Sequence, residues 1–131
     1  MSTEKSYNLH EVLQGIFAKL PDSYSFERDE KRIQEFFYRS QSSGNSVLQE
    51  IAFDKDGPYP SSGHLSQAFY SFLFTGLIKS ISPSFNPCII SSDAMRIGFD
   101  RFCISHFSTP ELGELETLAR EFQKEFPPRK F

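Results

Sequence analysis

Tryptophan is absent from this 131-residue chain, cysteine occurs only twice, and the segment 57–92 carries a single fully charged side chain, Lys79. The spacing of Cys88 and Cys103 matches no metal-binding or redox motif, so neither a zinc site nor a disulfide framework is expected. The amino-terminal segment lacks an apolar signal core, and no apolar run approaches the roughly 18 residues of a membrane span. These absences predict a cytoplasmic protein that uses no metal, no cofactor and no membrane.

Positive charge is scarce as well, since 14 Lys and Arg stand against 17 Asp and Glu and the net charge is −3. Proteins that neutralise phosphates usually show a basic domain or a basic stripe. Neither half of this chain is basic, so the composition disfavours nucleic acid as the partner.

Phenylalanine is abundant, with 15 residues in the chain. Its side chain supplies apolar area without a polar group, which suits a packed core or an apolar contact surface. Aromatic residues usually end up buried, and this chain is long enough for a real core. We therefore expect most phenylalanines in the core of one domain that spans residues 1–131.

Hydrophobic periodicity predicts five helices. The first, from about Leu9 to Leu20, has the capping pair Asn8 and Glu11 before it and Pro21 after it. The second should cover about 26–40. The third, about 62–75, starts at a serine cap and stops at Gly76. A fourth is capped by Asp93 and buries Met95, Phe99, Phe102 and Cys103, and a fifth covers about 109–126 with Thr109 as its cap, Pro110 in its first turn and an apolar stripe.

Two short strands are predicted at 77–81 and 87–91, joined by the turn 82–86. The segment 46–53 is compatible with one helical turn or with a short strand, and 54–60 is a proline-rich turn. The order is then helix, helix, short element, helix, hairpin, helix, helix. Three helices followed by a β-hairpin is the winged-helix order, so we expect a mostly helical α+β fold with a hairpin wing and carboxy-terminal helices.

The predicted helix 62–75 is apolar around nearly all of its circumference. Such a helix either lies in the centre of the core or docks against a partner. Tyr and Phe on a weakly charged surface anchor protein interfaces. The favoured hypothesis is therefore a non-enzymatic protein-interaction or regulatory module, whose partner binds around Tyr59, His64, Gln67, Tyr70 and Phe85.

The alternative hypothesis is a dimeric winged-helix transcriptional regulator that places the helix 62–75 in the major groove of DNA. Gln67 and Ser71 would then reach base edges, and Lys79 would contact a phosphate. Phosphate contacts dominate such affinities and come mainly from Lys and Arg, of which this segment has one.

An enzyme is the third hypothesis. Ser62 with His64 and Ser105 with His106 are neighbours in sequence only, and neither serine sits in a glycine elbow. Serine caps and surface histidines account for these pairs more simply. The histidines also lack metal-ligand spacing, so no catalytic or metal-binding residue is predicted.

The last helix carries a regular apolar stripe, with charged side chains on its other side. Such a stripe can pack on its own domain, or it can join two copies of the chain into a homodimer. The sequence leaves both outcomes open.

The segment Phe53–Ile78 resembles a pattern found in Panacea-type and related small bacterial winged-helix-like proteins. There, a helix that ends in aromatic residues leads to an aromatic-x-x-x-Gly-Pro turn and then to a helix that closes on Gly-Leu-Ile. The matching positions are Phe36, Phe37, Tyr38, Phe53, Gly57, Pro58, Tyr59, Gly76, Leu77 and Ile78. The resemblance implies a domain of antitoxins, proteolytic adaptors and mobile-element proteins, which act through protein partners. It transfers the Gly57–Pro58 turn and no binding residue.

Overall fold

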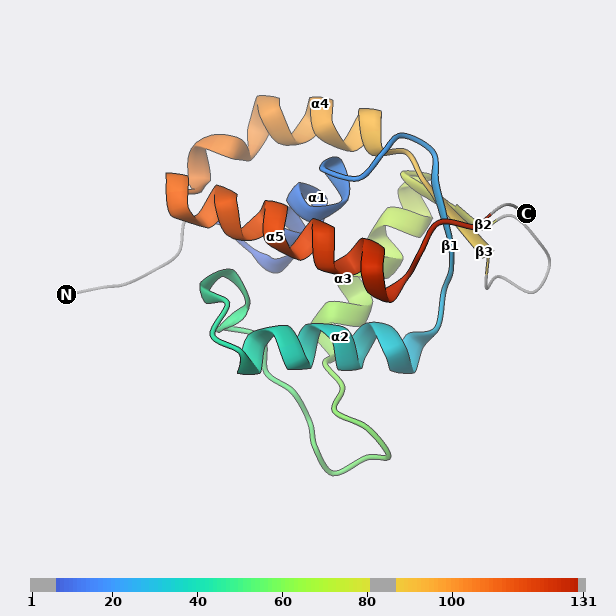
Figure 1. The fold of residues 1–131 in the computed structure, drawn as a ribbon, viewed down its shortest axis with the longest axis vertical. Helices are drawn as coiled ribbons and strands as arrows, with labels where there is room; N and C mark the ends of the chain where they lie inside the picture. The colour runs from blue at the N-terminus through green and yellow to red at the C-terminus, as the bar shows by residue number, and fades with distance from the viewer. Residues whose placement is uncertain (1–6, 81–86, 130–131) are drawn as a thin grey trace.

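Five α-helices and a three-stranded antiparallel sheet make up the part of the chain that the computed structural model describes, residues 7–80 and 87–129 (Figure 1). The expected α+β, mostly helical class is thereby confirmed. The elements are α1 (Leu9–Ala18), β1 (Tyr24–Glu27), α2 (Glu30–Ser42), the 3-10 turn η1 (Ser46–Leu48), α3 (Gly63–Thr75), β2 (Ile78–Ser80), β3 (Pro87–Ile90), α4 (Ser92–Phe102), the 3-10 turn η2 (Ile104–His106) and α5 (Thr109–Glu125).

The sheet lies at one end of the molecule, with the strands in the order β1-β3-β2. Both expected hairpin strands are present: Ile78 lies opposite Ile90, and Ser80 lies opposite Cys88. The turn expected between them falls in 81–86, outside the described residues. β1 completes the sheet from the other side of β3, where Tyr24 also lies opposite Ile90.

β1 corrects the expectation that the second helix begins near Phe26. Tyr24 and Phe26 point into the core, whereas Glu27 points outward, which is the alternation of a half-buried strand. α2 begins only at Glu30, because the Asp29 carboxylate accepts a hydrogen bond from the Arg32 backbone and caps the helix there.

The expected caps of the other helices are confirmed in part. Asn8 and Glu11 form the predicted capping box of α1, while Ser62 caps α3 and Gly76 ends it in the left-handed conformation, at φ +83°. At α5 the cap is Ser108, not Thr109, because the Ser108 hydroxyl accepts a hydrogen bond from the Glu111 backbone. α4 likewise begins two residues earlier than expected, with Ser91 in place of Asp93 at the cap position, so that Asp93 lies in its first turn.

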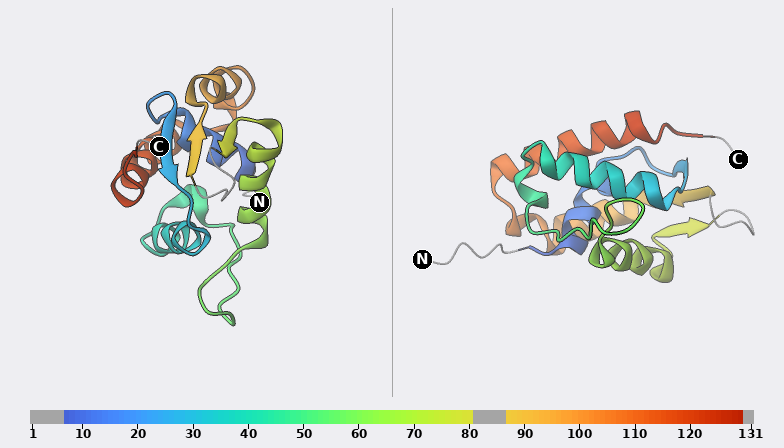
Figure 2. Two further views of the ribbon diagram at one scale, coloured as in Figure 1. Left: turned by 90° about the vertical axis from the view of Figure 1, so that its right-hand side faces the viewer. Right: turned by 90° about the horizontal axis from the view of Figure 1, so that it is seen from below.

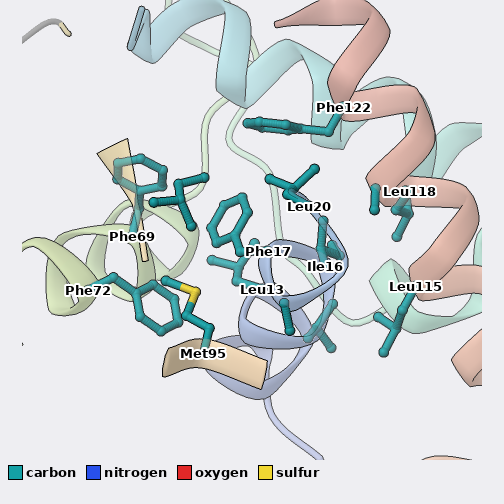
Figure 3. Packing of buried hydrophobic residues seen from close by; sticks show 14 of the residues in the cluster. Leu13, Ile16, Phe17, Leu20, Phe69, Phe72, Met95, Leu115, Leu118 and Phe122 are labelled. Atoms are coloured by element: carbon teal, nitrogen blue, oxygen red, sulfur yellow. The ribbon is translucent and has the colours of Figure 1, made fainter. Parts of the chain in front are cut away.

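α1 is the innermost helix. Figure 2 shows α3 and α5 on opposite sides of it, with α4 above and α2 below in the view of Figure 1. Phe17 of α1 is fully buried and meets Phe69, Phe72 and Phe122 edge to face, with ring centroids 6.1, 6.2 and 5.5 Å away (Figure 3). The expected role of phenylalanine in the core is confirmed at the six that are fully buried: Phe17, Phe26, Phe37, Phe72, Phe99 and Phe122.

Phe102 departs from the expectation for α4. Met95, Phe99 and Cys103 are buried as predicted, but Phe102 is 68% exposed. α4 ends at Phe102, and the chain turns there into η2, so Cys103 takes the inward position at the end of the helix. One large apolar side chain is thus left on the surface.

The predicted proline-rich turn is a loop that projects from the body of the molecule beside α2 (Figure 2). Its base is closed by two backbone hydrogen bonds: Asp54 N–H donates to Ser61 over 2.7 Å, and Ser61 N–H donates back over 3.0 Å. The preceding segment contains the 3-10 turn η1, which settles the choice between a helical turn and a strand in favour of the helical turn.

Candidate functional site

α3 lies on the outside of the helical body and has two different flanks. Leu65, Phe69 and Phe72 point inward and are buried. α3 is therefore not central to the core. Its outer side is exposed to solvent but carries large apolar side chains, since Tyr70 is 50% exposed and Phe74 is 95% exposed. The two flanks of α3 present different chemistry.

The first flank faces the sheet and forms a shallow hollow of about 740 Å³. Both of its charged side chains are basic, and its apolar residues include the exposed Phe74. We call this surface the α3–β2 patch; it is lined by Arg28, Tyr70, Leu73, Phe74, Ile78, Lys79 and Ser80.

Arg28 occupies the inner side of the α3–β2 patch. Its guanidinium carbon lies 5.5 Å from the centre of the Tyr70 ring, within the range of a cation–π interaction. Its Nη1 is buried and has no hydrogen-bond partner in the described part of the chain. A buried guanidinium donor without an acceptor is costly, so this atom is ready to donate to an incoming carboxylate.

The second flank faces α1 and η1 and holds a cleft of about 580 Å³. Its floor is apolar, and polar side chains stand at its sides. We call it the α1–α3 cleft; its lining is Tyr7, Asn8, Leu9, His10, Val12, Val47, Glu50, Ile51, His64, Gln67, Ala68 and Ser71.

His10 forms part of the wall of the α1–α3 cleft. Its ring stacks on the buried Phe72, with centroids 4.3 Å apart. Burial lowers the pKa of His10 below its ordinary value of 6.5, an effect that the nearby Glu11 carboxylate opposes only in part. The imidazole is therefore neutral near pH 7. Tyr7, at the mouth, donates from its hydroxyl to Glu111 over 2.8 Å, and burial is the main reason that its pKa is raised.

The structure does not bring the predicted partner-binding residues into one face. Tyr70 belongs to the α3–β2 patch, whereas His64 and Gln67 line the α1–α3 cleft. Tyr59 is half-buried on the projecting loop. Phe85 lies outside the described residues.

The residues predicted for DNA binding are divided in the same way. Gln67 and Ser71 line the cleft, and Lys79 lies on the other flank of α3. Sequence reasoning missed Arg28 and Phe74. Phe74 could have been found, because it lies nine positions after the buried Leu65, half a helical circumference away.

One member of each serine–histidine pair has a structural partner. The Ser62 hydroxyl caps α3 by accepting a hydrogen bond from the Leu65 backbone over 3.2 Å. His106 Nδ1 lies 2.7 Å from the Glu11 carboxylate, on the far side of α1 from α3. Within residues 7–80 and 87–129, no group of three or more His, Cys, Asp or Glu side chains is arranged to hold a metal ion.

The apolar stripe of α5 is used inside the chain. Leu115, Leu118, Ala119 and Phe122 are buried. The outward side of α5 carries charges, of which Glu125 pairs with Arg39 at 3.1 Å. The stripe that a homodimer would need is therefore already covered by the chain's own core.

Comparison with protein-family models, with curated proteins and with solved structures finds no match to this chain. Among the described residues, none of the helices combines the length and the apolar character needed to cross a bilayer. The site residues must therefore carry any functional argument.

Proposed function

We propose that this chain is a non-enzymatic, regulatory protein-interaction module on a winged-helix scaffold, and that it binds an acidic segment of a partner protein through the α3–β2 patch. The scaffold part of the proposal draws on connectivity. Three helices precede a hairpin, and a short strand between the first two helices joins the hairpin's second strand, in the order β1-β3-β2. This connectivity supports the winged-helix part of the proposal, although fold alone assigns no function.

The observation that carries the proposal is Phe74, which is 95% exposed beside Arg28 and Lys79, two basic side chains that form no ion pair with another described residue. Transfer of a phenylalanine side chain from water into an interface contributes about 1.5–3 kcal/mol. Tyr, Phe and Arg are also the residue types that dominate interface energetics when they lie together. The α3–β2 patch thus supplies both an apolar anchor and its polar surround.

Charge favours an acidic partner. Arg28 and Lys79 are the charged side chains that line the α3–β2 patch, although the chain as a whole carries a net charge of −3. A carboxylate that reached Arg28 would satisfy its buried Nη1. These groups match a partner segment that carries acidic residues and one apolar side chain, which would pack on the surface beside Phe74.

DNA remains the second candidate, because the recognition helix of a winged-helix reader corresponds to α3. Duplex binding would need several cations alongside that helix. Two further arginines near α2 and α4 are engaged in ion pairs: Arg32 Nη2 lies 3.7 Å from Glu125, and Arg96 pairs with Asp93. These two arginines are therefore engaged within the chain, and the two cations that line the α3–β2 patch, Arg28 and Lys79, are few for a phosphate backbone.

The proposal is tested with the whole chain immobilised and exposed to a nuclease-treated lysate of its native cell. Phe74→Ser removes the apolar anchor, and Lys79→Glu reverses one charge. Ile97→Ser is the matched control, because Ile97 is an exposed apolar residue of α4, 62% accessible. We expect a protein that is retained by the unaltered chain and by Ile97→Ser, and whose affinity falls by about 2 kcal/mol in Phe74→Ser.

Two results would overturn the proposal. One is a partner that Phe74→Ser and Lys79→Glu retain as well as the unaltered chain does. The other is the recovery of no protein, together with duplex binding by the pure chain that weakens steeply as salt rises, which is the behaviour of the DNA-binding alternative.

A further inference from the structure

We propose that the α1–α3 cleft binds a small organic cation, an amine with an apolar body. This inference concerns the opposite flank of α3 from the α3–β2 patch and does not depend on the protein contact proposed above. The volume of the cleft, its apolar floor and the negative charge of its lining together indicate the chemistry of the ligand.

The size and construction of the cleft fit a ligand site. Its volume of about 580 Å³ lies within the range of about 300–1,000 Å³ in which small-molecule sites fall. Three segments far apart in sequence form its walls: the start of α1, the η1 region and α3. The floor residues Val12, Val47 and Ala68 are buried in the body of the molecule, so the shape of the cleft is set by the core.

Four polar side chains converge on the cleft without hydrogen-bond partners in the described part of the chain: His10, Glu50, His64 and Gln67. Elsewhere in the same lining the polar groups are occupied. The Asn8 side chain accepts from the Glu11 backbone, and the Ser71 hydroxyl donates to the Ala68 carbonyl over 2.7 Å. The open donors and acceptors are thus concentrated where a ligand's polar end would lie.

The charge of the lining selects a cation. Among the described residues that line the cleft, Glu50 is the one fully charged side chain, and none is Lys or Arg. Two further carboxylates bind groups at or beside the lining: Glu111 accepts a hydrogen bond from the Tyr7 hydroxyl, and Glu114 accepts one from the Ser46 backbone N–H over 2.6 Å. A phosphate or carboxylate would meet only negative charge here, whereas an ammonium group has Glu50 as its counterion.

The absence of tryptophan makes the test direct, since an indole probe can be followed by its own fluorescence. Tryptamine, indole-3-ethanol and indole-3-propionate share one ring and a two-carbon arm, and carry a positive, a neutral and a negative end. We expect fluorescence anisotropy to report binding of tryptamine with a Kd on the order of 1 mM, the value usual for a ligand of this size. Indole-3-ethanol should bind more weakly, and indole-3-propionate more weakly still.

Two variants locate the probe. Glu50→Gln, at an exposed position, should weaken the binding of tryptamine about two- to fivefold, because an exposed ion pair contributes that much. The affinity for indole-3-ethanol should stay unchanged. Ser71→Phe, which fills the cleft from α3, should abolish binding of all three probes, with circular dichroism to establish that the variant is folded. Glu116→Gln, on the exposed side of α5, is the matched charge control and should bind as the unaltered chain does.

The inference is overturned if tryptamine gives no anisotropy change at several times the expected Kd, or if the three probes bind equally well. It is also overturned if Glu50→Gln and Ser71→Phe both bind tryptamine like the unaltered chain. Loss of the protein partner in Phe74→Ser has no bearing on these outcomes, so the two proposals fail separately.

Discussion

Gly15 allows α1, α4 and α5 to meet closely. A Cβ atom at this position would lie 2.7 Å from Leu115 Cδ1 and 2.7 Å from Phe99 Cε1. Both contacted residues are buried in the core and have little room to move.

Gly15→Ala should therefore lower the free energy of unfolding by about 1–3 kcal/mol, the usual cost of overpacking. Gly113→Ala is the matched control, because Gly113 is helical too and a Cβ there meets nothing within 4 Å. Gly113→Ala should raise the free energy of unfolding by up to about 1 kcal/mol, because alanine has a higher helix propensity than glycine. Urea unfolding of the three proteins measures both effects, and equal stability of the two variants would contradict the close crossing.

His10 should make stability depend on pH. Its pKa is lowered in the folded chain and returns to about 6.5 on unfolding, so the unfolded chain binds more protons in the window just below pH 6.5. The free energy of unfolding should fall as the pH drops through that window. His10→Gln should reduce the slope. Urea titrations between about pH 7 and pH 5 measure the slopes.

Among the elements, the start of α5 gives the sharpest test of capping. The Ser108 hydroxyl accepts from the Glu111 backbone, and the Glu111 carboxylate accepts the Ser108 N–H over 2.8 Å. Ser108→Ala should cost about 1 kcal/mol of stability, whereas Thr109→Ala should change it by less than about 0.5 kcal/mol. Thermal unfolding compares them, and the reverse order would place the cap at Thr109.

Elements that a local pattern marks could be predicted from the sequence, as α1 and the hairpin strands β2 and β3 were, whereas β1 could not. The apolar period of α1 extends over three turns and identifies the helix without ambiguity. β1 has only four residues, and its neighbour β3 is more than 60 positions away, so no local pattern reveals the pairing. The same limit explains Arg28, which reaches α3 only because β1 sets its position.

The candidate site could be predicted only as a region. The sequence placed Tyr70, Gln67 and Ser71 on the accessible side of α3, where Tyr70 and Gln67 are indeed exposed, but it missed the exposed Phe74. Their division between a patch and a cleft depends on what stands beside each flank, β2 on one side and α1 on the other. Such neighbours come from distant segments, and a helical period contains no information about them.

At the scale of the whole molecule, we expect the projecting loop to contribute little to the stability of the fold. Asp54 and Ser61 form a hydrogen-bonded pair, the geometry that closes a two-residue hairpin turn. Replacement of residues 55–60 by Asn-Gly should therefore leave the fold intact and change the free energy of unfolding by no more than about 1 kcal/mol, because closure entropy varies slowly with loop length.

Circular dichroism and urea unfolding test this replacement, which also removes Tyr59. The shortened chain should still bind its partner through the α3–β2 patch, since the loop contributes no residue to that surface. A chain that fails to fold would show that the loop supports α2. A folded chain that no longer binds the partner would show that Tyr59 contributes to partner binding.

The position of α1 has a consequence for biosynthesis. α1 leaves the ribosome before α5 does. The side chains that cover α1 include Leu115, Leu118 and Phe122, which are made about a hundred residues later. Until α5 emerges, the nascent chain carries Leu13, Ile16 and Phe17 without their final cover, a state that invites aggregation. α1 is therefore made well before the helix that covers it, and its apolar face stays uncovered until α5 has emerged.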